Sequence, residues 1–130
     1  MSEGIDIEQV KAKLRAEIAA LEKARGELQG KVNKLRNART QLNTIKSNAN
    51  TGKTYADTAK EKWKKEYPEN KSDEINNGFD DLYGGIEALN GEIDSCITDI
   101  NTSITQLEIE IADLDDRLEP LYRRLHNLGG

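Results

Sequence analysis

The feature that most constrains the fold is a stripe of apolar residues that recurs every three or four positions from Ile75 to Leu128. This spacing keeps the residues on one narrow face of an α-helix. A stripe of this length is typical of a coiled-coil seam. Extra steps of four near Ile93–Ile97–Ile100–Ile104 predict a stutter, where the supercoil locally unwinds. The stripe comprises Ile75, Phe79, Leu82, Ile86, Leu89, Ile93, Ile97, Ile100, Ile104, Leu107, Ile111, Leu114, Leu118, Leu121, Leu125 and Leu128.

A second heptad pattern predicts another long helix over residues 6–47. After Ile7, leucines recur every seven residues from Leu14 to Leu42. Asp6 precedes the pattern and is suited to cap the helix N-terminus with its carboxylate. The second seam position, between the leucines, is assigned to Val10, Ala24, Ala38 and Ile45. Glu17 and Lys31 interrupt this series, and the adjacent Ile18 and Val32 are expected to take the apolar role there.

The segment between the two patterns predicts a break and a short helix. Residues 47–52 are rich in Asn, Ser and Gly, which disfavour a helix interior, so the first helix is expected to end there. A Thr-x-x-Asp pattern then predicts a short helix over 54–67. Pro68 should end it, because proline disfavours the helical conformation in the preceding residue. Ser72 or Asp73 is expected to cap the long helix over 73–127.

The fold class predicted is all-α: one elongated antiparallel two-helix coiled-coil hairpin, a single domain over residues 1–130, with the short helix as its connection. Residues 6–46 contain ten basic and five acidic residues, whereas residues 73–119 contain one basic and fourteen acidic residues. Opposite charges favour pairing of the two helices. The connection is too short for a parallel arrangement. The expected packing seam sets Leu14, Leu21, Leu28 and Leu35 against Ile104, Leu107, Ile111 and Leu114.

The sequence offers no constellation for chemistry. Cys96 and His126 are the single residues of their kinds, so an internal disulfide and a zinc-type cluster are excluded. Cys96 lies beside the seam and is expected to be a small core residue. The string Thr51–Thr54 is similar to the end of a phosphate-binding loop, but it lacks the first glycine and the preceding strand that such a loop needs. We therefore expect no enzyme, no cofactor and no metal.

Charge and hydropathy exclude other classes of partner. The net charge of −5 and the lack of aromatic residues in the basic first helix argue against nucleic-acid binding. No apolar run approaches the roughly 18–20 residues of a membrane span. The acidic start of the chain lacks the apolar core of a Sec signal peptide. The protein is expected to be cytoplasmic when made, with export by a Sec-independent route left open.

Two features in the middle of the chain carry a resemblance to a known class of proteins. Trp63 stands between the two long helices, and Tyr83-Gly84-Gly85-Ile86-Glu87 fits a Tyr-x-x-x-Asp/Glu export pattern. With the hairpin architecture, these features resemble the small helical-hairpin proteins of Gram-positive type VII (ESX-like) secretion. The chain looks most like the helical proteins that accompany LXG-domain toxins, relatives of the WxG-type hairpins. It departs from the WxG pattern because Lys64 and Lys65 follow Trp63.

The resemblance implies a chaperone-like targeting factor that binds a helical segment of an LXG toxin and supports its export. It also implies that Trp63, Tyr83 and Glu87 carry recognition. Because the neighbouring Leu82 is assigned to the seam, the Tyr83 ring is expected to point outward. The partner would be the toxin's N-terminal helical domain or a second small hairpin protein. Two alternatives stay open: the protein is a structural coiled coil that binds a second copy of itself, or Trp63 and Tyr83 only pack together to close the hairpin.

Overall fold

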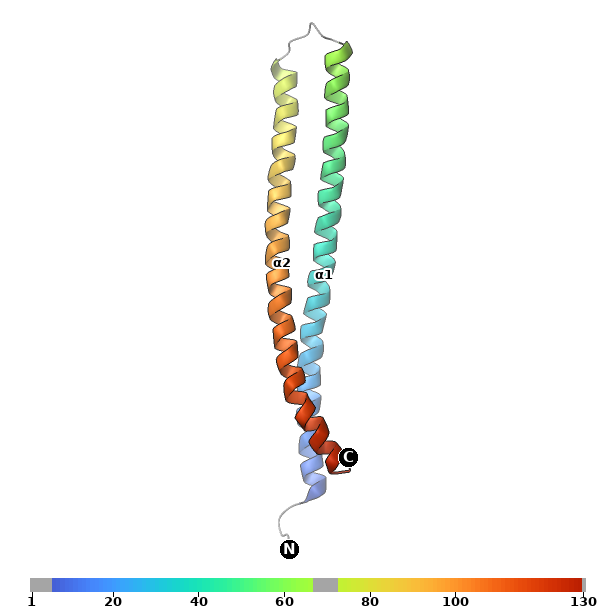
Figure 1. The fold of residues 1–130 in the computed structure, drawn as a ribbon, viewed down its shortest axis with the longest axis vertical. Coiled ribbons are helices and arrows are strands. Elements are labelled where there is room, and N and C mark those ends of the chain that lie inside the picture. Colours follow the sequence, from blue (N-terminus) through green and yellow to red (C-terminus); the bar gives the residue numbers. More distant parts are fainter. Residues whose placement is uncertain (1–5, 67–72, 130) are drawn as a thin grey trace. The chain divides into compact units, whose positions relative to one another are not determined.

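The protein is an all-α helical hairpin, as the sequence predicts (Figure 1). The computed structural model describes residues 6–66 and 73–129. Two helices account for nearly all of these residues: α1 is Ile7–Glu66 and α2 is Asp73–Asn127. No strand occurs within the described ranges.

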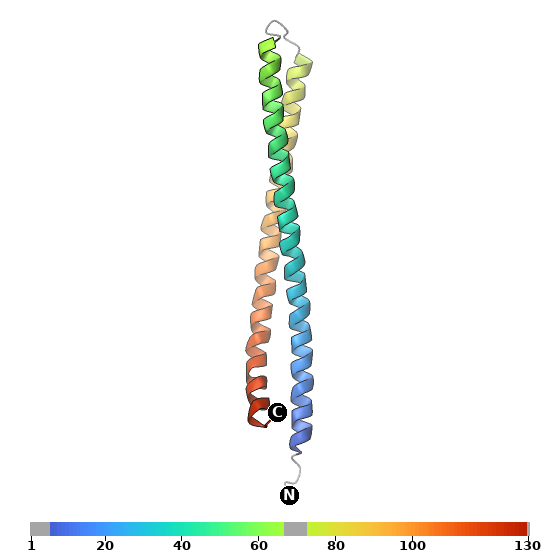
Figure 2. The same cartoon turned by 90° about the vertical axis from the view of Figure 1, so that its right-hand side faces the viewer.

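The chain divides into two compact units, each built from a stretch of α1 and a stretch of α2 (Figure 2). The first unit consists of residues 1–36 and 102–130, and the second of residues 37–101. Within each unit the two stretches run antiparallel, since ion pairs join early residues of one to late residues of the other. Each unit therefore has its own two-helix interface.

The first helix does not end at residues 47–52, so the predicted break and the separate short helix are wrong. α1 is continuous from Ile7 to Glu66. The polar side chains are accommodated because threonine hydroxyls donate to carbonyl oxygens one turn earlier: Thr51 to Ser47 at 3.1 Å and Thr54 to Asn50 at 3.2 Å. These bonds satisfy side chains that would otherwise favour a turn. The predicted stop at Pro68 and the cap at Ser72 or Asp73 lie outside the described side chains.

The inward-facing residues of both helices follow an unbroken alternation of three- and four-residue steps, so the predicted stutter is also wrong. Buried and half-buried residues recur in this alternation over the whole of both helices. In α1 the residues in this alternation are Lys11, Leu14, Ile18, Leu21, Arg25, Leu28, Val32, Leu35, Arg39, Leu42, Lys46, Ala49, Lys53, Ala56, Lys60 and Trp63. Half-buried residues outside it are Gln29, Gly30 and the predicted seam residues Val10, Ala24 and Ala38. In α2 the residues in the alternation are Asn76, Phe79, Tyr83, Ile86, Asn90, Ile93, Ile97, Ile100, Ile104, Leu107, Ile111, Leu114, Leu118, Leu121, Leu125 and Leu128.

The sequence prediction chose the wrong neighbour for several of these positions. In α1 the inward-facing residues include Arg25 and Lys46. Ile45, which directly precedes Lys46 and was predicted to lie in the seam, is 46% exposed. In α2 the inward row contains Tyr83 and Asn90 in place of the predicted leucines beside them. Long basic side chains can bury their methylene stems and still deliver their charge to the edge of an interface. Polarity alone therefore does not keep a residue out of the seam.

The first unit contains most of the fully buried side chains. Leu14, Ile18, Val32, Ile104, Ile111 and Leu118 are each at most 7% exposed. The N-terminus of α1 is capped as predicted, because the Asp6 carboxylate accepts hydrogen bonds from the backbone N–H groups of Glu8 and Gln9 at 3.0 and 3.4 Å. Burial of the six apolar side chains named above removes apolar surface from water and so stabilises the pairing of the two helices.

The register of the first unit differs at one end from the predicted pairing. A Cβ atom placed on Gly129 would lie 3.9 Å from the Lys11 Nζ atom, so the start of α1 lies beside the end of α2. Leu14 consequently packs close to the C-terminal turns of α2, beyond the predicted range Ile104–Leu114. Leu28 and Leu114 line the same groove, as predicted. The seam of α2 extends to Leu128, and this length shifts the pairing.

Candidate interaction surface

One side of each unit carries the polar contacts between the helices. In the first unit, Arg25 Nε donates to Asp115 Oδ1 at 2.5 Å. In the second unit, Lys46 Nζ lies 2.6 Å from Asp94 Oδ1 and Lys60 Nζ lies 3.8 Å from Asp80 Oδ1. The acidic partners are separated along α2 by multiples of seven residues, so they form one row on the helix surface. We call this face the polar side.

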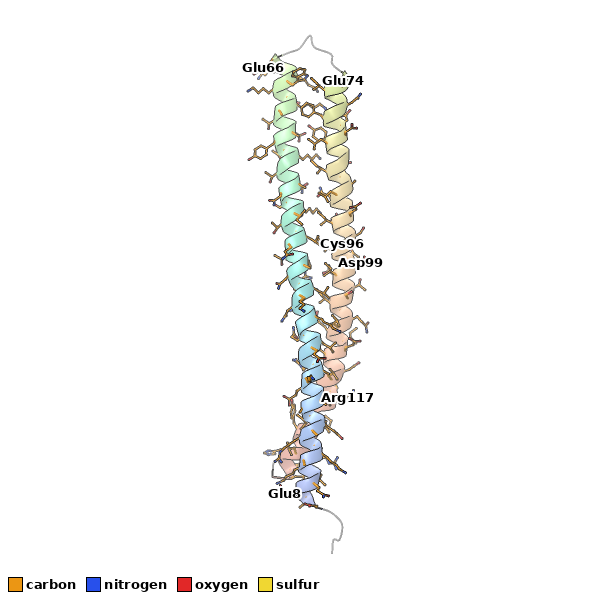
Figure 3. All side chains as sticks on the ribbon, turned by 180° about the vertical axis from the view of Figure 1, so that it is seen from behind. Glu8, Glu66, Glu74, Cys96, Asp99 and Arg117 are labelled. Atoms are coloured by element: carbon orange, nitrogen blue, oxygen red, sulfur yellow. The ribbon has the colours of Figure 1, made fainter. Side chains whose placement is uncertain are left out.

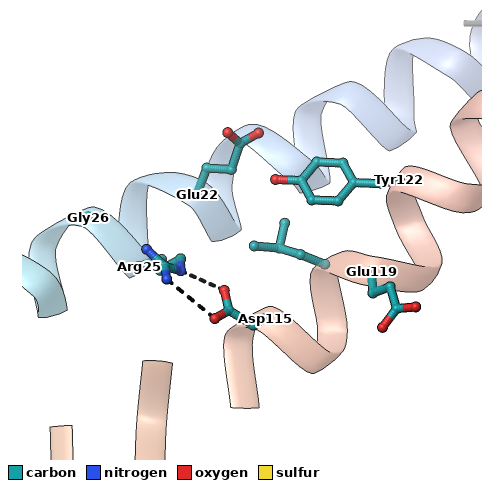
Figure 4. Close-up of a pocket in the computed structure, with 7 residues that line it drawn as sticks. Glu22, Arg25, Gly26, Asp115, Glu119 and Tyr122 are labelled. Carbon is teal, nitrogen blue, oxygen red and sulfur yellow. Dashed lines mark hydrogen bonds and ion pairs between the residues drawn. The ribbon is translucent and has the colours of Figure 1, made fainter. Parts of the chain in front are cut away.

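A shallow pocket lies on the polar side of the first unit, and charged residues that line it interact with one another (Figure 4). Arg25 is hydrogen-bonded to both Asp115 oxygens, at 2.5 and 3.3 Å, and this bond raises the pKa of Arg25 above its usual value. The Tyr122 hydroxyl points toward the Glu22 carboxylate in Figure 4. Partial burial, followed by that carboxylate, raises the pKa of Tyr122. These groups satisfy one another, and the pocket is a structural feature of the seam.

Tyr83 is an inward-facing residue of the second unit, so the prediction of an outward ring is wrong. Its ring stacks on Phe79 with a centroid distance of 6.5 Å, and the Lys60 ammonium lies 5.5 Å from its centroid. The hydroxyl oxygen is shielded from solvent and has no well-aligned hydrogen bond. It faces Asp57, and this weak interaction, followed by burial, raises the pKa of Tyr83 to about 12. Aromatic stacking and the nearby cation hold the ring against α1.

The Tyr83 environment predicts a loss of stability in alkali. The folded state keeps the Tyr83 proton up to about pH 12, whereas the ordinary pKa of tyrosine is 10.0. Between these values the folded state holds more protons than the unfolded state, so stability falls as pH rises. Urea unfolding at several pH values should show a smaller loss over this window for Tyr83→Phe than for the wild type. Equal losses in both proteins would contradict the assignment.

The structure does not bring the three predicted recognition residues onto one outward face. Trp63 is half-buried in the inward row of α1, close to where that helix ends at Glu66. Glu87 is exposed on α2, one turn after Tyr83, whose ring is turned toward α1. Of the three, Glu87 alone is exposed in this structure.

The side of the second unit away from the ion pairs carries an exposed apolar row that the sequence prediction had assigned to the core. Ile75, Leu82 and Leu89 are 36%, 48% and 40% exposed. They are seven residues apart, so they lie in line along α2. We call these three residues the apolar row. The sequence indicates this row, because over this stretch residues of two adjacent heptad positions could face α1. Only one of the two positions can do so, and the other must face outward.

The apolar row ends with the second unit. The next position in the same phase is Cys96, which is exposed, so its assignment to the core is wrong (Figure 3). Beyond it the same phase contains only polar and charged residues: Ser103, Glu110, Arg117 and Arg124. The first unit thus has the polar flank of an ordinary coiled coil, and the second unit has an apolar one.

Comparison with known protein families gives one match, to a family model described as YwqH-like, over residues 9–129. The chain belongs to the YwqH-like family. The matched range includes nearly all of α1 and α2, so the apolar row and the polar side both lie within the YwqH-like part of the sequence. No curated protein and no solved structure matches this YwqH-like chain.

The described residues of this YwqH-like hairpin contain neither a metal-type cluster nor a membrane-spanning stretch. Within residues 6–66 and 73–129, no three His, Cys, Asp or Glu side chains are grouped so that they could hold a metal ion. In the same ranges, neither helix has a stretch apolar and long enough to cross a membrane. The apolar row is the candidate interaction surface of this hairpin.

Proposed function

We propose that this YwqH-like hairpin is a non-enzymatic partner protein that binds a helical segment of a type VII secretion cargo of the LXG-toxin class and supports its export. The observation that carries the proposal is the apolar row. The hairpin completes its own seam with other residues and still leaves three large aliphatic side chains in line on its surface. Such a row is suited to an added amphipathic helix, which recognises its partner through residues at heptad spacing.

The resemblance to the proteins that accompany LXG toxins supports the choice of cargo. The export pattern at Tyr83 and Glu87 belongs to that resemblance, and the exposure of Glu87 leaves its carboxylate available to a secretion component. The half-buried Tyr83 ring would then act mainly by holding the helix in place. This division of roles is part of the proposal.

The binding test uses an LXG toxin encoded at the same locus as this protein. The N-terminal helical domain of the toxin, co-expressed with the hairpin, should co-elute with it in size-exclusion chromatography with a defined mass by light scattering. A toxin domain from an unrelated locus is the control. A hairpin that does not co-elute with the toxin domain and forms a stable homo-oligomer at low micromolar concentration would instead indicate a structural coiled coil.

Export is tested with two variants that preserve the fold. Glu87→Gln removes a charge from an exposed side chain, and Tyr83→Phe retains the ring that stacks on Phe79. We expect Glu87→Gln to reduce secretion of the cargo several-fold, because the carboxylate is lost from the export pattern. Its melting temperature should stay within a degree or two of the wild type, since exposed substitutions change stability by about 0.5 kcal/mol or less. If the cargo is secreted with Glu87→Gln as well as with the wild type, the Tyr83–Glu87 export pattern has no role in export.

A further inference from the structure

We infer that the apolar row is the docking site for a basic amphipathic helix of another protein, which lies along the second unit beside α2. This inference rests on the proposed function and assigns it a surface and a partner chemistry. The exposed aliphatic side chains of Ile75, Leu82 and Leu89 supply the apolar contact. The sign of the charge around them determines what kind of helix can make it.

The rim of the row on α2 is acidic. Residues 73–101 contain eight Asp and Glu residues and no Lys or Arg. Two of the acids, Asp80 and Asp94, face lysines of α1 on the polar side. Asp73 and Glu87 occur in the same heptad phase as these two. Among the described residues, no ion pair joins the other four acids of this stretch to a basic group, and all four are exposed. These are Glu74, Asp81, Glu92 and Asp99, of which Figure 3 labels Glu74 and Asp99 on α2.

The positions beside the row leave it open to a partner. Glu92 follows Leu89 by one turn, and the equivalent positions after Ile75 and Leu82 are Gly78 and Gly85. A Cβ atom at either glycine would meet nothing within 4 Å, so the described residues leave space directly beside both positions. A helix can therefore approach the three aliphatic side chains from the acidic flank.

On the α1 side, the residues across from Leu82 and Leu89 are small and uncharged. The contacts of Asn50 with Asn90 and of Lys60 with Asp80 fix the antiparallel register of the second unit. That register places Gly52 across from Leu89 and Ala59 across from Leu82, and both small residues are exposed. The same register places the exposed Glu66 across from Ile75. A third helix would thus lie between two small residues and one acidic residue on α1 and the three aliphatic residues on α2.

Charge complementarity selects a different protein over a second copy as the occupant. Two copies that joined their apolar rows would bring the acidic rims of two α2 helices together, and like charges at the flanks of a helix pair disfavour pairing. A helix with Leu or Ile at heptad spacing and Lys or Arg beside them would meet opposite charge along its length. The occupant is therefore a basic amphipathic helix.

The surface is tested with synthetic peptides of about 20 residues, long enough to form helix on binding. One has leucines at heptad spacing flanked by lysines, a second has glutamates in place of the lysines, and a third keeps the lysines but has serines in place of the leucines. Fluorescence anisotropy with the full chain should give at least about tenfold tighter binding for the first peptide than for either other one. Its affinity should fall as NaCl rises from about 0.05 to about 0.5 M, because salt screens exposed charges.

Paired variants locate the site. Leu82→Ser with Leu89→Ser should weaken binding of the lysine–leucine peptide at least about tenfold, since two half-exposed leucines lose their apolar contact. Ile109→Ser is the matched control, because Ile109 is a 51% exposed isoleucine on α2 in the first unit, and it should bind as the wild type does. Equal binding by all three proteins would overturn the inference.

The same variants separate this inference from the proposed function. If the toxin domain binds the wild type and the Leu82→Ser, Leu89→Ser variant equally, the inference fails while the proposed function stands. If the lysine–leucine peptide binds the wild type more tightly than the double variant but the toxin domain binds neither, the docking surface is supported and the proposed cargo is wrong. A wild-type dimer in analytical ultracentrifugation that the double variant abolishes would show that the occupant is a second copy, which also overturns the inference.

Discussion

Replacement of Ile111 by Asp should lower the free energy of unfolding by about 3–5 kcal/mol, because it places an unpaired charge in the most buried row of the first unit. Ile111 is 7% exposed and belongs to the inward row of α2. For a chain of this size the melting temperature should fall by roughly 10 °C or more. Thermal unfolding followed by circular dichroism at the helix band measures the change.

The chain provides a matched control two residues away. Ile109 is on the same helix and is 51% exposed. Ile109→Asp introduces the same charge into the same α2 segment without burying it, so its effect on stability should be about 0.5 kcal/mol or less. Similar melting temperatures for the two variants would show that the phase of the seam in the first unit is wrong.

Replacement of Gly52 by Pro should destabilise the second unit by about 3 kcal/mol or more, because proline in a helix interior removes a backbone hydrogen bond and clashes with the preceding turn. Gly52 lies within α1, in the stretch where the sequence predicts a break. If residues 47–52 formed a connection between two helices, an exposed position there would tolerate proline. Urea unfolding measures the difference, which is large enough to exclude one of the two arrangements.

Gly52→Ala gives the opposite sign and serves as the control for the same position. Alanine is favoured over glycine in a helix interior by about 1 kcal/mol, and a Cβ atom at residue 52 would meet nothing within 4 Å. The variant should therefore be more stable than the wild type. A loss of stability in Gly52→Ala would indicate a backbone conformation at Gly52 that only glycine adopts, contrary to a continuous α1.

The sequence proposes candidate recognition residues but does not determine how their side chains are oriented. The resemblance pointed to Tyr83 and Glu87, which are one turn apart on α2. Their spacing does not determine which of the two faces α1, and the structure turns the Tyr83 ring inward against Phe79. Orientation was not predictable because Leu82 is the more apolar neighbour, and the choice between them depends on the partner helix.

The break in α1 was mispredicted for a related reason. Asn, Ser, Thr and Gly between Ser47 and Thr54 have low helix propensity, which is a local property. In the structure the same residues lie on α1 opposite α2, where Ala56 is buried and Asn50 accepts a hydrogen bond from Asn90 at 2.9 Å. Tertiary contacts such as these outweigh a propensity difference of about 1 kcal/mol at a single position.

The sequence by itself determined that the protein is helical, that two long amphipathic segments pair, and that they pair antiparallel. Heptad spacing, the split in charge and a short connection suffice for these conclusions because they depend on period and sign alone. Only the tertiary structure decided which of two adjacent phases faces inward. Lys46 and Tyr83 occupy the interface, and Ile45 and Leu82 remain outside it. The reason is that an unbroken alternation keeps both helices in contact along their length, and the stems and partners of the polar side chains offset the cost of burying them.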